Sequence, residues 1–92
     1  MVLALSLLNP VFAQLRTIPQ DAKRGEIRHL HDMLVELDGK EQRLSPGAQI
    51  RDANNRLVLP TSLTEKWEVK YLLDGQGLVH RVWILTAQEK AK

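Results

Sequence analysis

Alternation of apolar and polar residues, interrupted by short turn signals, is the feature that most constrains this chain. From Lys66 to Leu73 every second position, starting at residue 67, is apolar, and residues 74–77 (Asp-Gly-Gln-Gly) follow as a turn. A repeat of two residues is typical of a strand that buries one face. The pattern predicts a strand over residues 66–73, a hairpin turn, and a second strand over residues 78–86.

A second alternating stretch covers residues 27–37 and places its odd-numbered side chains on an inward face. A helix is an alternative there, because four apolar residues also recur with a period of about 3.6: Ile27, Leu30, Leu34 and Leu37. Asp38-Gly39 favours the strand, since Asp-Gly is a preferred centre of the type I′ hairpin turn.

Further short strands are expected over residues 41–44, 48–52 and 56–59, with turns at 45–47 and 53–55, because these turns contain Pro, Gly or Asn. A single open sheet of such strands would expose two edges. The sequence therefore predicts an all-β fold: a small, closed or partly open antiparallel barrel of about five strands.

The N-terminus carries a different signal. The first fifteen residues hold no charge, and ten of the first thirteen are apolar, with Ala13 and Val11 small enough for signal peptidase. We expect a signal-like helix over residues 1–13, cleaved after Ala13, and a periplasmic protein; an uncleaved anchor or a buried N-terminal helix are the alternatives. A polar leader (14–24), the barrel (25–87) and a polar tail (88–92) complete the organisation, with no stable membrane span after processing.

Composition excludes several classes of function. The chain has no cysteine, so it has neither disulfides nor thiolate chemistry. Its net charge is +2 with acids interleaved among the bases, which disfavours a nucleic-acid partner. No nucleophile elbow and no glycine-rich phosphate loop is present. The chain is not expected to be an enzyme, and no cofactor is expected.

The signal-like segment, the short leader, the five strands and the Val35-Glu36-Leu37-Asp38-Gly39 hairpin resemble the small periplasmic OB-fold-type domains of Gram-negative bacteria. The likeness covers residues 25–86. The helix that such domains usually carry between the third and fourth strands has only residues 61–65 to occupy here, enough for one helical turn. The resemblance implies a binding or stress-related protein without catalysis, and it implies no particular ligand.

Two histidines and a methionine alternate within the 27–37 stretch, and they are the candidate metal ligands. His29, His31 and Met33 would share one face of a strand and could hold a copper or zinc ion, with His80 as a further ligand if the last strand lies beside the first. In outline this resembles a small periplasmic copper or silver chaperone, although the tryptophan–methionine–methionine cluster of that family is absent. Inward histidines bonded to backbone and a methionine that fills the core are the structural alternative.

Three residues are candidates for a binding surface: Trp83, Arg81 and Tyr71. Aromatic side chains on an OB-type barrel can stack on a ligand, and arginines, among them Arg51 and Arg56, can rim such a patch. The alternative is that the aromatic residues form the core. The predicted function is thus a non-catalytic periplasmic binding module for an unknown envelope protein or small ligand, with metal binding as the alternative.

Overall fold

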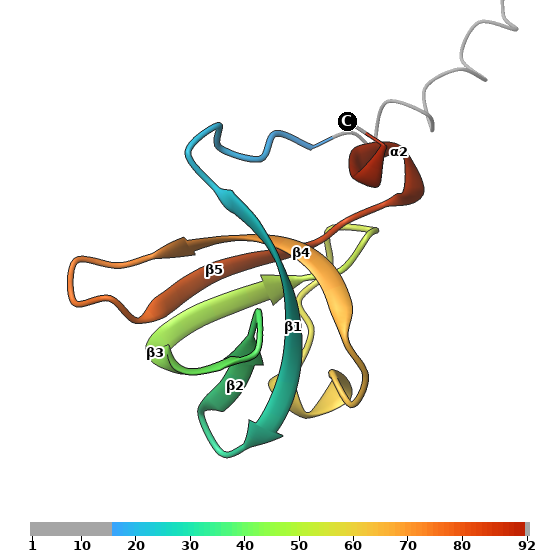
Figure 1. Cartoon of the computed structure of the whole chain (residues 1–92). Coiled ribbons are helices and arrows are strands. Elements are labelled where there is room, and N and C mark those ends of the chain that lie inside the picture. Colours follow the sequence, from blue (N-terminus) through green and yellow to red (C-terminus); the bar gives the residue numbers. More distant parts are fainter. Residues whose placement is uncertain (1–15, 92) are drawn as a thin grey trace, which may run out of the picture.

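Five strands form the body of the computed structural model, which describes residues 16–91. They are β1 (Lys23–His31), β2 (Leu34–Leu37), β3 (Lys40–Arg51), β4 (Trp67–Leu73) and β5 (Val79–Ile84). The strands close into a barrel in the order β1-β2-β3-β5-β4, and β4 pairs with β1 to complete the circle (Figure 1). The all-β class and the closed barrel of about five strands are confirmed. The expected signal-like helix lies outside the described residues.

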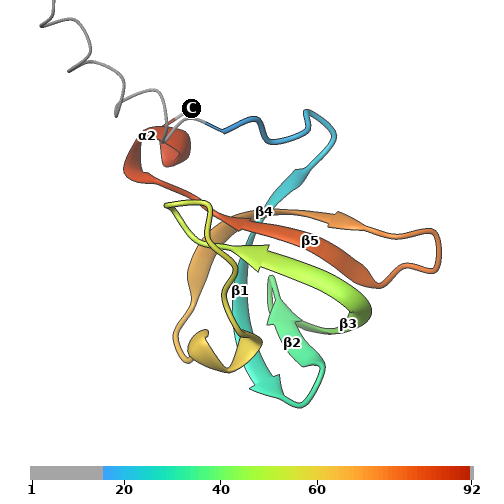
Figure 2. The same ribbon diagram turned by 180° about the vertical axis from the view of Figure 1, so that it is seen from behind.

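One strand pair departs from the expected antiparallel barrel. β3 and β5 run parallel, whereas the other four pairs are antiparallel. The connector between β3 and β4 carries the chain to the start of β4, and the β4–β5 hairpin then returns β5 alongside β3 in the same direction (Figure 2). A purely antiparallel barrel was therefore a wrong expectation, because β5 inserts between β3 and β4.

Two tight turns shape the segment that the sequence suggested was a single strand, one at its end and one within it. The turn at Asp38-Gly39 is as predicted, with positive φ angles of 54° and 82° at its two central residues. A second turn at Asp32-Met33 was not predicted; it separates β1 from β2, and Asp32 adopts a φ of 51°. Asp tolerates this left-handed region better than most residues. Residues 27–37 are thus a hairpin rather than one strand.

β3 is longer than expected because the predicted turn at residues 45–47 is a bend inside the strand. Its pairing with β5 jumps from Leu44–Val79 to Gln49–Arg81, which leaves the intervening residues without a ladder partner on β5. Pro46 is tolerated there, since it has no N–H group to contribute. Bulges of this kind help a sheet to curve into a barrel. The strand expected at residues 56–59 is reduced to a single bridge between Arg51 and Leu57.

The barrel interior is filled by ten buried apolar side chains, one of which does not come from a strand. The ten are Ile27, Val35, Leu37, Leu44, Ile50, Leu63, Val69, Val79, Val82 and Ile84. Leu63 follows the short 3-10 helix η2 (Pro60–Ser62) in the connector, and its carbonyl accepts a hydrogen bond from the His29 N–H group at 2.8 Å. The connector therefore closes one end of the barrel without the longer helix seen in the resembled domains.

The inward face expected for β4 is buried only at its centre. Val69 is fully buried, whereas Trp67 is 42% exposed and Leu73 is 44% exposed. Leu73 precedes the β4–β5 hairpin, which extends beyond the body of the barrel (Figure 1), and Trp67 lies at the opposite end of the strand. The side chains at both ends of β4 are therefore exposed although the alternation continues.

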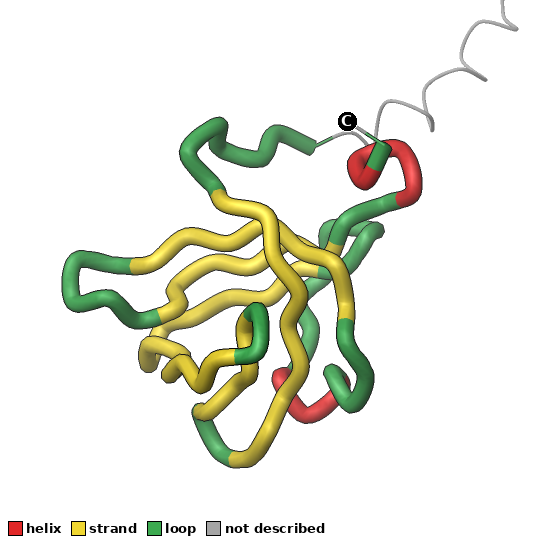
Figure 3. Tube along the Cα trace, in the orientation of Figure 1, coloured by secondary structure: helices red, strands yellow, loops and turns green. Residues whose placement is uncertain are grey.

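The two ends of the described chain lie side by side. The helix α2 (Ala87–Lys90) occupies the expected polar tail, next to the start of the described chain (Figure 3). Thr86 caps it and forms a reciprocal capping box with Glu89. The Arg16 guanidinium group forms an ion pair with Glu89 at 2.8 Å and fastens the leader to this helix. Within residues 16–91, no helix has the length and apolar character needed to cross a membrane.

Candidate functional site

The three histidines do not form the arrangement that the alternation suggested. The register of β1 and β2 shifts between His29 and His31, so their side chains no longer alternate on a regular inward face. The His31 side chain is 69% exposed and lies 3.3 Å from the Asp32 carboxylate, while the His29 ring contacts the Asp32 carbonyl at 2.9 Å. Met33, in the turn, is also exposed. The expectation that these residues share an inward face is wrong, because a bulge and a turn interrupt the strand.

His80 lies on β5, which pairs with β3 and β4 and not with β1. It does not join the other two histidines through a shared strand pair. Across residues 16–91, no three His, Cys, Asp or Glu side chains are placed to hold a metal ion together. The copper or zinc interpretation gains no support from this geometry.

His80 instead shares a hydrogen bond of 2.9 Å with the Ser45 hydroxyl group. A serine next to a histidine is the beginning of a nucleophilic pair. Ser45, however, is 3% exposed and lies in the bend of β3, where a substrate carbonyl has no access. The pair acts as a cross-link that holds the bend of β3 against β5.

The Asp74 carboxylate, in the β4–β5 turn, is a titratable group close to His80. Its Oδ1 atom accepts hydrogen bonds from the backbone N–H groups of Leu78 at 2.9 Å and Gln76 at 2.8 Å. These bonds, led by that from Leu78, lower the pKa of the Asp74 carboxyl group, and the nearby His80 acts in the same direction. The carboxylate is used to fix the β4–β5 turn.

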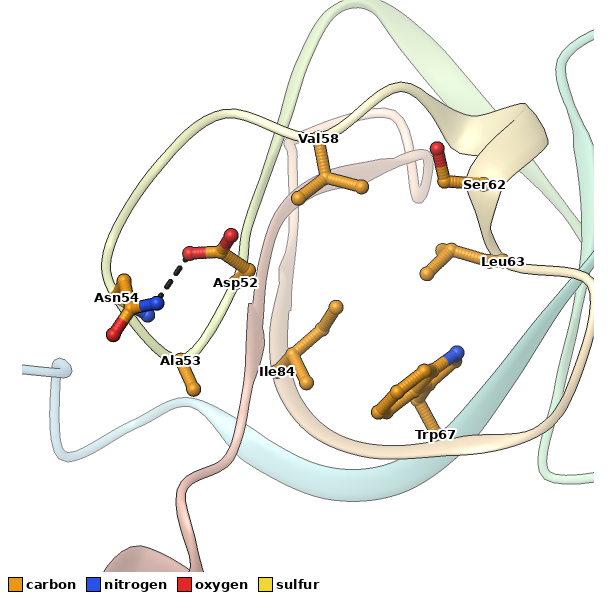
Figure 4. Close-up of a pocket in the computed structure, with 8 residues that line it drawn as sticks. All are labelled: Asp52, Ala53, Asn54, Val58, Ser62, Leu63, Trp67 and Ile84. Atoms are coloured by element: carbon orange, nitrogen blue, oxygen red, sulfur yellow. Dashed lines mark hydrogen bonds between the residues drawn. The ribbon is translucent and has the colours of Figure 1, made fainter.

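A cavity of about 290 Å³ lies at the end of the barrel closed by the connector. Val58, Leu63, Trp67 and Ile84 surround it with apolar groups, and Asp52 and Asn54 lie on the turn at its edge (Figure 4). The Asp52 carboxylate accepts hydrogen bonds from the backbone N–H groups of Asn54 and Arg56, each at 2.9 Å, and these bonds stabilise the turn. The cavity offers an indole surface and few polar groups, which suits a small apolar ligand.

A different site forms on the outer face of β3, β5 and β4. The register aligns Arg51, Trp83 and Lys70 in one row across the three strands, and Gln49, Arg81 and Leu72 in the next. Neighbouring strands lie about 4.8 Å apart, and alternate residues of one strand about 6.5–7 Å apart. We call these six half-buried residues the Trp83 face. The register thus places three cationic residues next to Trp83 on one face of the sheet.

The charges of these cations are not neutralised within the described residues. Arg51 donates to the carbonyl of Asn55 at 2.9 Å and to the side-chain oxygen of Gln49 at 3.4 Å, and Arg81 donates to two backbone carbonyls. None of the ion pairs formed in residues 16–91 includes Arg51, Lys70 or Arg81. The carboxylate closest to Lys70 along β4 is Glu68, which is bound by Arg24 at 2.9 Å.

The third predicted binding residue, Tyr71, belongs to the other side of the sheet. It pairs with the buried Val82 in the β4–β5 ladder. Its side chain is partly buried and packs against the core, close to Gly25. Residues that face each other in a ladder share a side of the sheet, so Tyr71 points away from Trp83. The structure therefore places Trp83 and Arg81, two of the three predicted binding residues, on one face of the sheet. Tyr71 is not part of this face, whereas Arg51 and Lys70 are.

The sequence placed Lys70 on the solvated side of its strand and gave no indication that it lies in a binding site. Its proximity to Trp83 depends on the register between β4 and β5, which alternation along a single strand does not determine. The cavity was likewise missed, because the alternation placed Trp67 on the inward face of its strand.

Comparisons of the chain with protein-family models, with curated proteins and with solved structures give no match. The geometry of the Trp83 face and of the cavity is therefore the basis for a functional proposal.

Proposed function

We propose that this protein is a non-catalytic binding module, exported to the periplasm, that recognises an anionic partner through the Trp83 face. The observation that carries the proposal is the group of Arg51, Lys70 and Arg81 around Trp83, with no carboxylate of residues 16–91 paired to any of them. Arginine and tryptophan are the residues that most often dominate the binding energy of interfaces. Here they lie on rigid strands rather than on loops.

Two further features support a binding role. The strand order β1-β2-β3-β5-β4, with β3 and β5 parallel, agrees with an OB-type barrel, an architecture that binds its ligands on the outer surface of the sheet. Two of the three cations are also held in place before a ligand arrives, because Arg51 and Arg81 are hydrogen-bonded to neighbouring carbonyl groups. Such preorganisation lowers the entropic cost of binding.

Export rests on the sequence alone. The uncharged apolar segment that ends near Ala13 supports a cleaved signal, and the absence of cysteine is compatible with an oxidising compartment. Fractionation of cells that express the full chain tests this point: the proposal requires a shortened form in the periplasm, and a full-length form in the cytoplasm contradicts it.

The binding proposal is tested with poly-L-glutamate as an anionic probe and the Trp83 emission as the readout, in a Trp67→Phe background. Binding should weaken strongly when Arg51, Lys70 and Arg81 are replaced together by Gln. The matched control replaces three exposed cations elsewhere, Lys40, Arg43 and Lys66, and has the same net charge. Equal losses in the two triple variants mean that only net charge matters, and this result contradicts a specific site.

A further inference from the structure

This inference rests on the proposed function and names its partner. We propose that the Trp83 face binds an extended acidic segment of another protein, in which a carboxylate side chain is followed two residues later by an aromatic or aliphatic side chain. The basis is the placement of Arg81 and Trp83 on one face of β5, together with the unused edge of the Arg81 guanidinium group.

Arg81 is oriented to receive a carboxylate. Both of its hydrogen bonds leave from Nη1, to the carbonyl of Gly47 at 3.1 Å and to its neighbour His80 at 2.9 Å. Within the described residues, the Nε and Nη2 groups have no hydrogen-bond partner. These two groups form the edge with which a guanidinium group binds both oxygens of a carboxylate. One edge of Arg81 is therefore fixed to the barrel, and the other is available to a ligand.

The spacing along β5 matches that of an extended peptide. Arg81 and Trp83 are separated by one residue, Val82, whose side chain is buried on the opposite side. Alternate side chains of any extended chain lie about 6.5–7 Å apart, so a peptide that runs along β5 repeats the interval between Arg81 and Trp83. A carboxylate over Arg81 then places the side chain two residues away over the indole ring, where apolar and aromatic groups pack well.

Arg51 on β3 and Lys70 on β4 lie on either side of Trp83 and add positive charge to the face. Each lies one strand away from Trp83, about 4.8 Å in the direction of the ladder. They favour further acidic residues near the apolar one. The cationic group is short, however, because the next residue in the Trp83 row beyond Lys70 is Arg24, whose charge is paired with Glu68. Three cations suit a short acidic segment better than a nucleic-acid strand, whose binding needs a longer series of phosphate contacts.

The test compares two blocked peptides of identical composition, Gly-Glu-Ser-Phe-Ser-Glu-Gly and Gly-Glu-Phe-Ser-Ser-Glu-Gly, by the Trp83 emission of the full-length Trp67→Phe chain. Only the first has its carboxylates two residues from the phenylalanine. We expect it to bind about fivefold more tightly, a ratio that corresponds to roughly 1 kcal/mol. The preference should disappear in Arg81→Gln and persist in Arg43→Gln. Arg81→Lys should keep the general attraction to poly-L-glutamate and lose the preference, since Lys cannot bind a carboxylate with two parallel N–H groups.

Equal binding of the two peptides, or a preference that survives in Arg81→Lys, overturns the inference. If poly-L-glutamate still binds through the face in that case, the proposed function stands and only the partner class fails. If poly-L-glutamate binding is insensitive to the face, the proposed function itself fails. Tighter binding of phosphatidylglycerol vesicles or of oligo-deoxythymidine than of the first peptide, at the same salt concentration, assigns the face to a membrane or to a nucleic acid instead.

Discussion

Replacement of Arg16 by Ala should destabilise the barrel although Arg16 lies outside every strand. Its guanidinium group donates to the carbonyls of Asp52 and Ile84, each at 2.6 Å, and forms an ion pair with Glu89. The Arg16 side chain is only 5% exposed, so its removal takes a buried, charged hydrogen-bond donor away from two carbonyl groups and one carboxylate. Asn55 still donates to the Asp52 carbonyl, and Thr86 still donates to the Glu89 carboxylate. A hydrogen bond to a charged group contributes about 1.5–3 kcal/mol, and we expect a total loss of about 2–4 kcal/mol because two of the three acceptors keep another donor and water can reach part of the site.

Thermal unfolding followed by circular dichroism measures this loss. For a domain of this size each kcal/mol lowers the midpoint by about 4–8 °C, so a loss of about 2–4 kcal/mol in Arg16→Ala should lower it by roughly 8–32 °C. Arg43→Ala is the control, because the Arg43 side chain is exposed and makes no hydrogen bond or ion pair within residues 16–91; this substitution should change the stability by less than about 0.5 kcal/mol. A midpoint for Arg16→Ala within about 3 °C of the parent would show that the leader is not part of the folded domain.

Two further predictions concern the connector and the pH dependence of stability. Leu63→Ala should cost about 2–5 kcal/mol in urea unfolding, because this fully buried side chain closes the barrel end; a loss below about 1 kcal/mol contradicts that role. The hydrogen bond from Arg16 lowers the pKa of the Glu89 carboxyl group from its ordinary value of 4.5. This contribution to stability is therefore present above about pH 4.5 and is lost as the pH falls through the lowered pKa. The stability difference between the parent and Glu89→Gln should shrink on acidification, and a difference that is constant from pH 7 to about pH 2.5 refutes the linkage.

The sequence predicted those parts of the fold that depend on local chemistry. The Asp38-Gly39 turn was correct because both residues accept positive φ angles, and the β4–β5 hairpin was correct because alternation and turn signals agree. The turn at Asp32-Met33 was missed since neither glycine nor asparagine marks it. The bend at Pro46 was misread as a turn, because a proline inside a strand is tolerated only where the neighbouring strand does not pair, and pairing is not visible in the sequence.

The candidate site was predictable only along single strands. Arg81 and Trp83 share a face by the two-residue repeat, and this inference is consistent with the structure. The positions of Arg51 and Lys70 beside Trp83 depend on strand order and register, which are set by long-range packing. Tyr71 was grouped with Trp83 because both are aromatic, although their strands present them on opposite sides.

The most direct test of the central claim is a map of backbone amide chemical shifts during titration of the ¹⁵N-labelled chain with the acidic peptide Gly-Glu-Ser-Phe-Ser-Glu-Gly. Binding at the Trp83 face predicts that the largest changes occur in three short stretches, residues 49–51, 70–72 and 81–83, and that they diminish together in Arg81→Lys. Changes centred instead on the cavity beside Trp67, or spread evenly over the exposed cations, contradict the account.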